Sequence, residues 1–222
     1  MLRYTVLASD YDGTLADQGR VDAVTVAALE RWRISGGRLV LVTGRRLPDL
    51  IAVFPALDRC DYVLAENGAL LYTPRYTEER LLGDEPPARL IETLQQRQVE
   101  PLYVGRGVVA TLNPHESTVR EVLRELHLAW QVILNKNDVI VLPPGVHKAS
   151  GLQTALDLMG VSANATVAVG DAQNDLHMFE LCGYAVAVAN ALPEVKAQAD
   201  WITSSESSKG VVELIDRLLT MG

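Results

Sequence analysis

Cysteine is scarce in this 222-residue chain, which contains only Cys60 and Cys182. Two cysteines so far apart do not form a disulfide framework, and neither has the spacing of a zinc site, so a reducing compartment is favoured. Long apolar runs are also missing, since no stretch approaches the roughly 18 residues of a membrane span. Residues 1–4 lack the pattern of a secretion signal. We therefore expect a cytoplasmic protein with no membrane partner.

Positive charge is limited too. Lys and Arg total 20 against 28 Asp and Glu, which gives a formal net charge of -8. Proteins that bind nucleic acid without sequence preference need a basic face, so we expect no nucleic-acid partner. A chain this acidic repels anionic substrates unless it places positive charge locally. Only four lysines are available for that purpose: Lys136, Lys148, Lys196 and Lys209.

Hydrophobic residues (48%) and charged residues (22%) occur at ordinary globular levels. At both ends of the chain, short apolar runs alternate with helical patterns, which predicts an α/β fold. The predicted strands are 4–9, 38–42, 62–65, 69–72, 165–169, 184–188 and 201–203. The predicted helices are 21–35, a short one at Pro48, 149–158, 175–181, 193–198 and 211–219.

The pattern changes in the middle of the chain. Residues 73–88 are polar and rich in proline, which indicates a linker. After them we predict helices at 88–98 and beyond Pro114, and strands near 101–112, 131–134 and 138–142. Adjacent strands with two helices are typical of a small α+β layer. We therefore predict a Rossmann-like parallel-sheet core of residues 1–79 and 146–222, with a small α+β domain inserted at 80–145.

Open α/β sheets bind ligands at the carboxyl ends of their strands, and we expect four polar clusters to lie there. Each cluster alone has an ordinary structural explanation, such as a turn or a capped helix start. The clusters are Asp10-x-Asp12-Gly13-Thr14, Thr43-Gly44-Arg45, Lys148, and Gly170-Asp171-x-x-Asn174-Asp175.

Together these clusters predict a metal and phosphate site. Two unit charges 4 Å apart repel by roughly 4 kcal/mol at an effective dielectric of 20, so gathered carboxylates need a cation. Hard oxygen ligands suit Mg²⁺. A hydroxyl at Thr43, a backbone N–H at Gly44 and the ammonium of Lys148 suit a phosphoryl group. The carboxylates concerned are those of Asp10, Asp12, Asp171 and Asp175.

In wording and order, the four clusters resemble the signature of the haloacid-dehalogenase-like (HAD) hydrolases. The insertion between Thr43 and Lys148 resembles the Cof-like branch, whose core carries a C2-type cap domain. Residues 66–69 (Glu-Asn-Gly-Ala) and the tail from 190 to 211 resemble that branch as well. One departure is Lys148-Ala149, where many relatives have Lys-Gly.

The resemblance implies a role for each cluster. Asp10 would attack phosphorus and form an aspartyl-phosphate, and Asp12 would act as acid and base. Asp10, Asp12 (through its carbonyl) and Asp171 would hold Mg²⁺, with Asp175 close behind. Thr43, Gly44, Lys148 and Asn174 would bind or position the phosphoryl group, and Arg45 and Asn67 are candidate substrate contacts.

The resulting hypothesis is a Mg²⁺-dependent phosphomonoesterase that acts on a small phosphorylated metabolite, such as a sugar phosphate or phosphoglycolate, as a monomer or homodimer. Two alternatives stay open. A phosphomutase shares the aspartyl-phosphate step but returns the phosphate to a sugar. A non-enzymatic, phospho-accepting receiver-like module also places acidic residues, Thr and Lys at strand ends. In the insertion, Arg106 and Asn113 are candidate cap contacts, whereas a structural role is expected for His147 and His177.

Overall fold

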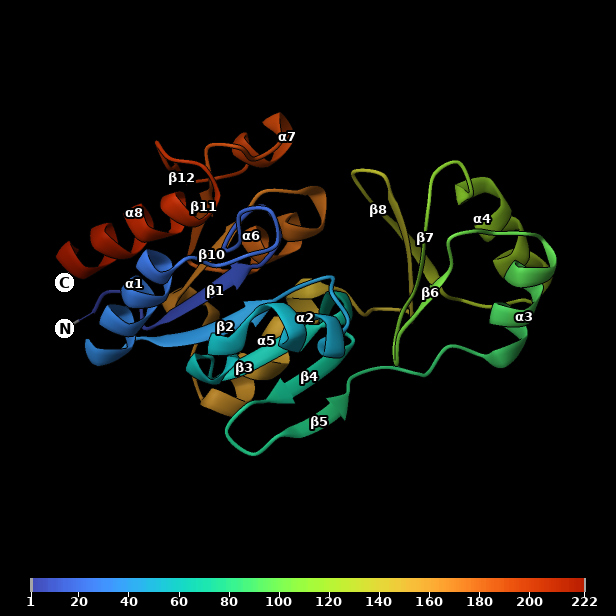
Figure 1. Ribbon diagram of the computed structural model, residues 1–222, viewed down its shortest axis with the longest axis horizontal. Coiled ribbons are helices and arrows are strands. Elements are labelled where there is room, and N and C mark those ends of the chain that lie inside the picture. The colour runs from blue at the N-terminus through green and yellow to red at the C-terminus, as the bar shows by residue number, and fades with distance from the viewer. Residues whose placement is uncertain (1, 222) are drawn as a thin grey trace.

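The computed structural model describes residues 2–221 and has two β-sheets (Figure 1). The larger sheet has the strand order β12-β11-β10-β1-β2-β3-β4-β5, and the smaller has the order β6-β7-β9-β8. Neighbours from β12 to β3 pair in parallel, whereas β4, β5 and the whole smaller sheet pair antiparallel. The predicted α/β core with an α+β layer is confirmed.

The larger sheet and its helices come from both ends of the chain. Its strands are β1 (Val6–Asp10), β2 (Arg38–Val42), β3 (Tyr62–Ala65), β4 (Leu70–Thr73), β5 (Glu78–Leu81), β10 (Thr166–Gly170), β11 (Tyr184–Ala187) and β12 (Trp201–Ile202). Its helices are α1 (Ala23–Ile34), α2 (Leu47–Val53), α5 (Lys148–Met159), α6 (Leu176–Leu181), α7 (Pro193–Lys196) and α8 (Ser207–Thr220). Short 3₁₀ turns are η1 (Pro55–Arg59), η2 (Glu66–Gly68), η3 (Ala163–Ala165) and η4 (Gln173–Asp175).

The central strands are buried on both faces. Every residue of β1 and of β10 is buried, which is why they read as continuous apolar runs rather than alternating ones. Helices α1 and α8 pack against each other, and α5 packs against α6. Within residues 2–221, no helix combines the length and the apolar character that crossing a membrane requires.

The smaller layer lies at the opposite end of the long axis (Figure 1). It contains α3 (Ala88–Gln96), β6 (Tyr103–Val104), β7 (Val109–Leu112), α4 (Glu116–Glu125), β8 (Gln131–Asn135) and β9 (Asp138–Leu142). Its two helices each turn an apolar face to the sheet, and their side chains form a core separate from the main one. That second core contains Leu90, Leu94, Val99, Val109, Val119, Val122, Leu123, Val139 and Val141.

The prediction that residues 73–88 are only a linker is wrong, because β5 forms there and pairs with β4. Glu78, Glu79 and Arg80 are exposed, so this edge strand has no apolar alternation that a sequence reading could detect. Helix α8 also begins four residues earlier than predicted, because its first turn is polar. The division of the chain at 79/80 stays a prediction, and β5 keeps residues up to Leu81 in the larger sheet.

Two glycines bring helix α5 close to the turn between β3 and β4. A Cβ atom on Gly151 would lie 2.8 Å from both the Cα and the carbonyl oxygen of Gly68. The start of α5 is fixed by a capping box, in which the His147 ring accepts from the Ser150 backbone and the Ser150 hydroxyl accepts from the His147 backbone. Lys148, the first residue of α5, is thereby held in a fixed position.

We predict that Gly151→Ala lowers the free energy of unfolding by about 1–3 kcal/mol, because the added methyl group overpacks against backbone. The sign is informative, since Gly→Ala in an open helix interior stabilises by up to about 1 kcal/mol. Leu158→Ala, at a half-exposed position of the same helix, is the control and should have a smaller effect. Urea unfolding of both variants checks this, and a stabilised Gly151→Ala would contradict the close approach.

Candidate active site

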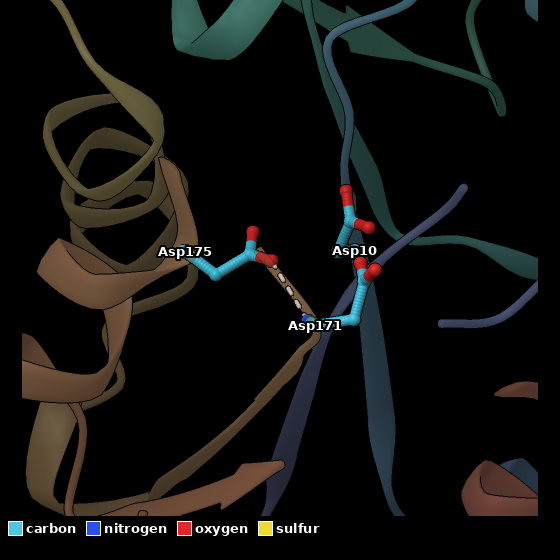
Figure 2. A group of neighbouring side chains, drawn as sticks. All are labelled: Asp10, Asp171 and Asp175. Carbon is cyan, nitrogen blue, oxygen red and sulfur yellow. Dashed lines mark hydrogen bonds between the residues drawn. The ribbon is translucent and has the colours of Figure 1, made fainter. Parts of the chain in front are cut away.

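Three carboxylates meet at the carboxyl edge of the larger sheet. Asp10 ends β1, and Asp171 directly follows β10, the parallel neighbour of β1. Asp175 lies one turn further on, in η4, and turns back so that its Oδ2 accepts the backbone N–H groups of Asp171 (3.0 Å) and Ala172 (3.1 Å). Figure 2 shows the three side chains converging. One oxygen from each lies within 4.8 Å of the others, and all three residues are buried.

Lys148 provides the buried positive charge of this group. Its Nζ donates to Oδ1 of Asp10 at 2.5 Å and to Oδ1 of Asp175 at 2.7 Å. Although burial lowers it, the pKa of Lys148 is raised overall by the charges of Asp10 and Asp175. The ammonium therefore stays charged and holds the two carboxylates together.

Asp10 has an environment that disfavours its ionised form. Burial raises its pKa most, Lys148 lowers it, and the charges of Asp175 and Asp171 raise it again, which places the pKa at about 8. A further cation that binds beside Asp10 would stabilise its ionised form and lower its pKa.

Lys136 is the residue that the sequence analysis missed. It lies at the tip of the β8–β9 hairpin, and its Nζ donates to Oδ2 of Asp171 at 2.8 Å. The other oxygen of Asp171 accepts from the Thr14 hydroxyl at 3.2 Å. The sequence shows a polar Asn-Lys-Asn-Asp turn between two strands, but it does not show which edge of the other sheet that turn approaches.

Asp12 does not join the three buried carboxylates. Its side chain is 49% exposed and receives a bidentate pair of hydrogen bonds, both 2.7 Å, from Nε and Nη2 of Arg45. Asp12 therefore lies at the expected edge and lines the same cavity as Asp10 and Asp171, but its side chain pairs with Arg45 rather than with the buried carboxylates. Arg45 also lies over the Tyr11 ring at 5.2 Å.

The other predicted site residues surround this group. Thr43 is fully buried, and its hydroxyl accepts from the Arg45 N–H at 3.1 Å. Nδ2 of Asn174 donates to Oδ1 of Asn67 at 2.9 Å, while Oδ1 of Asn174 is buried without a partner among the described residues. Gly44, Asn67 and Asn174 line the adjoining cavity.

Glycines make room for these side chains. A Cβ on Gly13 would lie 2.7 Å from Oδ2 of Asp171, and one on Gly170 would lie 2.5 Å from Oδ2 of Asp175. At Gly44, the nearest atom would be Nδ2 of Asn67 at 3.2 Å. The carboxylates of Asp171 and Asp175 therefore pack directly against the backbone of Gly13 and Gly170.

A cavity of about 360 Å³ opens above the carboxylates, between the two layers. This volume lies near the lower end of the range for small-molecule sites. The larger layer contributes Asp10, Asp12, Gly44, Arg45, Arg46, Asp49, Asn67, Lys148, Asp171, Ala172 and Asn174. The smaller layer contributes Tyr103, Val108, Ala110, Asn135, Lys136, Asp138 and Ile140.

The remaining candidates lie outside this cavity. Arg106 pairs with Glu79 at 2.7 Å, and its backbone N–H donates to the buried Glu66, as does the N–H of Gly107. These two bonds join the turn between β6 and β7 to the larger layer. Asn113 does not line the cavity. The rings of His147 and His177 stack at 4.7 Å, and the His147 ring caps α5.

The donor set fits a divalent cation. When all three buried carboxylates are ionised, they exceed the two ammonium groups that pair with them by one negative charge. Mg²⁺ prefers carboxylate oxygens and tolerates sites that supply only part of its ligands. Asp10, Asp171 and Asp175 could therefore hold Mg²⁺.

We predict that the metal-free protein loses stability as the pH rises from 5 to 8. The pKa of Asp10 is about 8 in the folded state against a model value of 3.8. The folded state therefore binds more protons between these values, and its stability falls by up to about 1.4 kcal/mol per pH unit from this group. Urea unfolding in a chelator, compared with Asp10→Asn, measures the difference. Equal pH dependence in the two proteins would contradict the raised pKa.

Comparison with known proteins agrees with this geometry. The haloacid dehalogenase-like hydrolase family matches residues 7–139 and 129–215. A phosphoglycolate phosphatase of Methanothermobacter thermautotrophicus is 33% identical over 221 residues, which cover 96% of this chain and 98% of that protein.

Solved structures share the fold at lower identity. A haloacid dehalogenase-like hydrolase from Bacteroides thetaiotaomicron is 22% identical with a TM-score of 0.80, and the match covers 97% of this chain and 99% of that one. A HAD/COF-like hydrolase from Plasmodium vivax is 18% identical with a TM-score of 0.84, covering 100% and 97%. The match over nearly the whole chain shows that this protein belongs to the haloacid dehalogenase-like hydrolases.

Proposed function

We propose that the protein is a Mg²⁺-dependent phosphomonoesterase that hydrolyses a small phosphorylated metabolite through an aspartyl-phosphate. The observation that supports this most is the buried Asp10, paired with Lys148 and facing a cavity of about 360 Å³ between two layers. Relatives named phosphoglycolate phosphatase favour an ester of that size class. From the scarcity of cysteine and the net negative charge, we also propose a cytoplasmic protein with no nucleic-acid partner, which acts as a monomer or homodimer.

In the first step, a carboxylate oxygen of Asp10 bonds to phosphorus while the P–O bond of the ester breaks. The carboxyl group of Asp12, protonated and released from Arg45, donates its proton to the departing alcohol oxygen. In the second step, Asp12 takes a proton from water, whose oxygen bonds to phosphorus. The bond from phosphorus to Asp10 then breaks, inorganic phosphate leaves, and Asp12 is again protonated.

Asp10, Asp171 and Asp175, with the carbonyl of Asp12, would hold Mg²⁺. When bound, the ion supplies positive charge that offsets the repulsion between a carboxylate nucleophile and a phosphate ester. Burying three carboxylates has a desolvation cost, and the two lysines offset only part of it. The bound ion would offset the rest.

The phosphoryl oxygens need donors that are in place before the reaction. Lys148 is fixed by the capping box and by two carboxylates. Gly44 and Asn174 line the cavity, while Thr43, which precedes Gly44 in the chain, is fully buried. Donors that are already oriented stabilise developing charge without reorganisation. Arg45 orients Asp12 in this structure, and Arg45 and Asn67 are proposed to contact the substrate.

We predict that Asp10→Asn lowers phosphate release by about 10³-fold or more, because the amide is not a nucleophile. Asp58→Asn, at an exposed carboxylate outside the site, is the matched control and should retain activity. A malachite-green assay with aryl and alkyl phosphates plus Mg²⁺ measures the effect. Near-normal turnover by a folded Asp10→Asn protein would rule out the proposed nucleophile.

We predict that Asp12→Asn separates the two steps. Alkyl esters should lose about 10²–10⁴-fold in kcat, the usual contribution of acid–base catalysis. An aryl phosphate such as p-nitrophenyl phosphate has a leaving group that needs no proton, so its first step should persist. Rapid mixing should then show a burst of about one equivalent of nitrophenolate, followed by slow turnover. Equal losses for both ester types and no burst would contradict the role of Asp12.

The same assays separate the two alternatives. A phosphomutase would require a bisphosphate activator and would return phosphate to a sugar rather than to water. A receiver-like module would form a long-lived aspartyl-phosphate without turnover. Steady release of inorganic phosphate from an ester excludes both.

A further inference from the structure

Lys136 connects the smaller layer to the cluster of buried carboxylates formed by Asp10, Asp171 and Asp175. Its Nζ is 2.8 Å from Oδ2 of Asp171, and the Lys136 side chain is half exposed at the tip of the β8–β9 hairpin. Its backbone N–H points to Oε1 of Gln173, in η4, at 3.4 Å. The hairpin tip therefore lies directly over the segment that contains Asp171 and Asp175.

The pairing of Lys136 with Asp171 changes if a divalent cation binds. Asp171 is one of the three carboxylates that could hold the ion. A cation coordinated to Asp171 repels the Lys136 ammonium, because both carry positive charge. It also neutralises the carboxylate to which that ammonium is hydrogen-bonded. Lys136 would then lose its partner while its long side chain remained in the cavity.

Other cations that line the cavity already have partners. Arg45 pairs with Asp12, and Arg46 pairs with Asp49, in each case at 2.7 Å. Lys148 is held between Asp10 and Asp175. Of the cavity-lining residues contributed by the smaller layer, Lys136 is the one with a positive charge. Positive charge released on metal binding would therefore appear on the part of the cavity wall that the smaller layer forms.

We propose that Lys136 determines specificity: when the cation takes Asp171, the Lys136 ammonium binds a carboxylate group on the alcohol portion of the phosphate ester. This inference rests on the proposed phosphomonoesterase function. The small cavity and the cavity-lining carboxylate of Asp138, two residues from Lys136, favour one compact, singly charged group over a second phosphate. The released ammonium and the carboxylate then form a charge-assisted hydrogen bond.

A matched pair of esters tests the specificity. Phosphoglycolate and ethyl phosphate have the same length, and only the first carries a carboxylate. We expect the wild-type protein to prefer phosphoglycolate and Lys136→Met to reduce the ratio of the two kcat/KM values by about 10- to 100-fold, the usual effect of losing a charged hydrogen bond. Lys136→Arg should restore part of the ratio, and Lys209→Met, on exposed α8 surface, should leave it unchanged.

Each contrary result has a distinct meaning. A wild-type protein that hydrolyses both esters without preference, or a Lys136→Met protein that loses equally on both, would overturn the inference and leave the proposed function intact. The absence of any hydrolysis by the wild-type protein with Mg²⁺, including p-nitrophenyl phosphate, would overturn the proposed function and this inference with it.

Metal binding to the free protein tests the exchange of partners without an activity measurement. Calorimetric titration with Mg²⁺ should give a severalfold lower Kd for Lys136→Met than for the wild type, because no ammonium competes for Asp171. Lys209→Met should match the wild type. An unchanged or higher Kd for Lys136→Met would show that Lys136 does not exchange Asp171 for the ion, and would overturn the inference.

Discussion

Mutual repulsion among the carboxylates of Asp10, Asp171 and Asp175 is the constraint on which the rest of the structure depends. They are buried, and one oxygen of each lies within 4.8 Å of the others. Burying such charges costs several kcal/mol per ion unless opposite charge is supplied at close range. The fold meets this requirement from two directions, with Lys148 from the start of α5 and Lys136 from the hairpin of the smaller sheet. The two layers thus meet where charge must be balanced.

Local packing holds the charged side chains of this cluster in fixed positions. The close approach of Gly151 and Gly68 and the capping box at His147 fix the first turn of α5. Asp175 accepts two backbone N–H groups, which fixes the carboxylate on the other side of Lys148. Next to Asn67 in the chain, the buried Glu66 accepts the backbone N–H groups of Arg106 and Gly107 and so joins the smaller layer to the larger. A reacting group held at several points loses little entropy when substrate binds.

Sequence reasoning succeeded where local pattern and sheet topology determine the outcome. The apolar runs at β2 and β3 predicted their bounds, and parallel pairing of β1 with β10 brings Asp10 and Asp171 together as expected. It failed where contacts depend on how two layers face each other. The contact between Lys136 and Asp171 joins residues 35 apart and has no periodic signal. Arg45 similarly pairs with Asp12 through side-chain geometry that spacing does not reveal, and β5 forms by backbone pairing alone.

The glycines that surround the carboxylates have a consequence for how variation in this protein is interpreted. At Gly13 and Gly170, a Cβ atom would lie within 2.7 Å of a carboxylate oxygen of Asp171 or Asp175, closer than real Cβ contacts allow. Neither offers a functional group, yet a side chain at either position would displace a carboxylate. In a library of random variants, these positions should therefore tolerate replacement as poorly as the aspartates themselves. At this edge of the sheet, a position can therefore be intolerant to substitution because no space is free for a side chain, and not only because its side chain takes part in the chemistry.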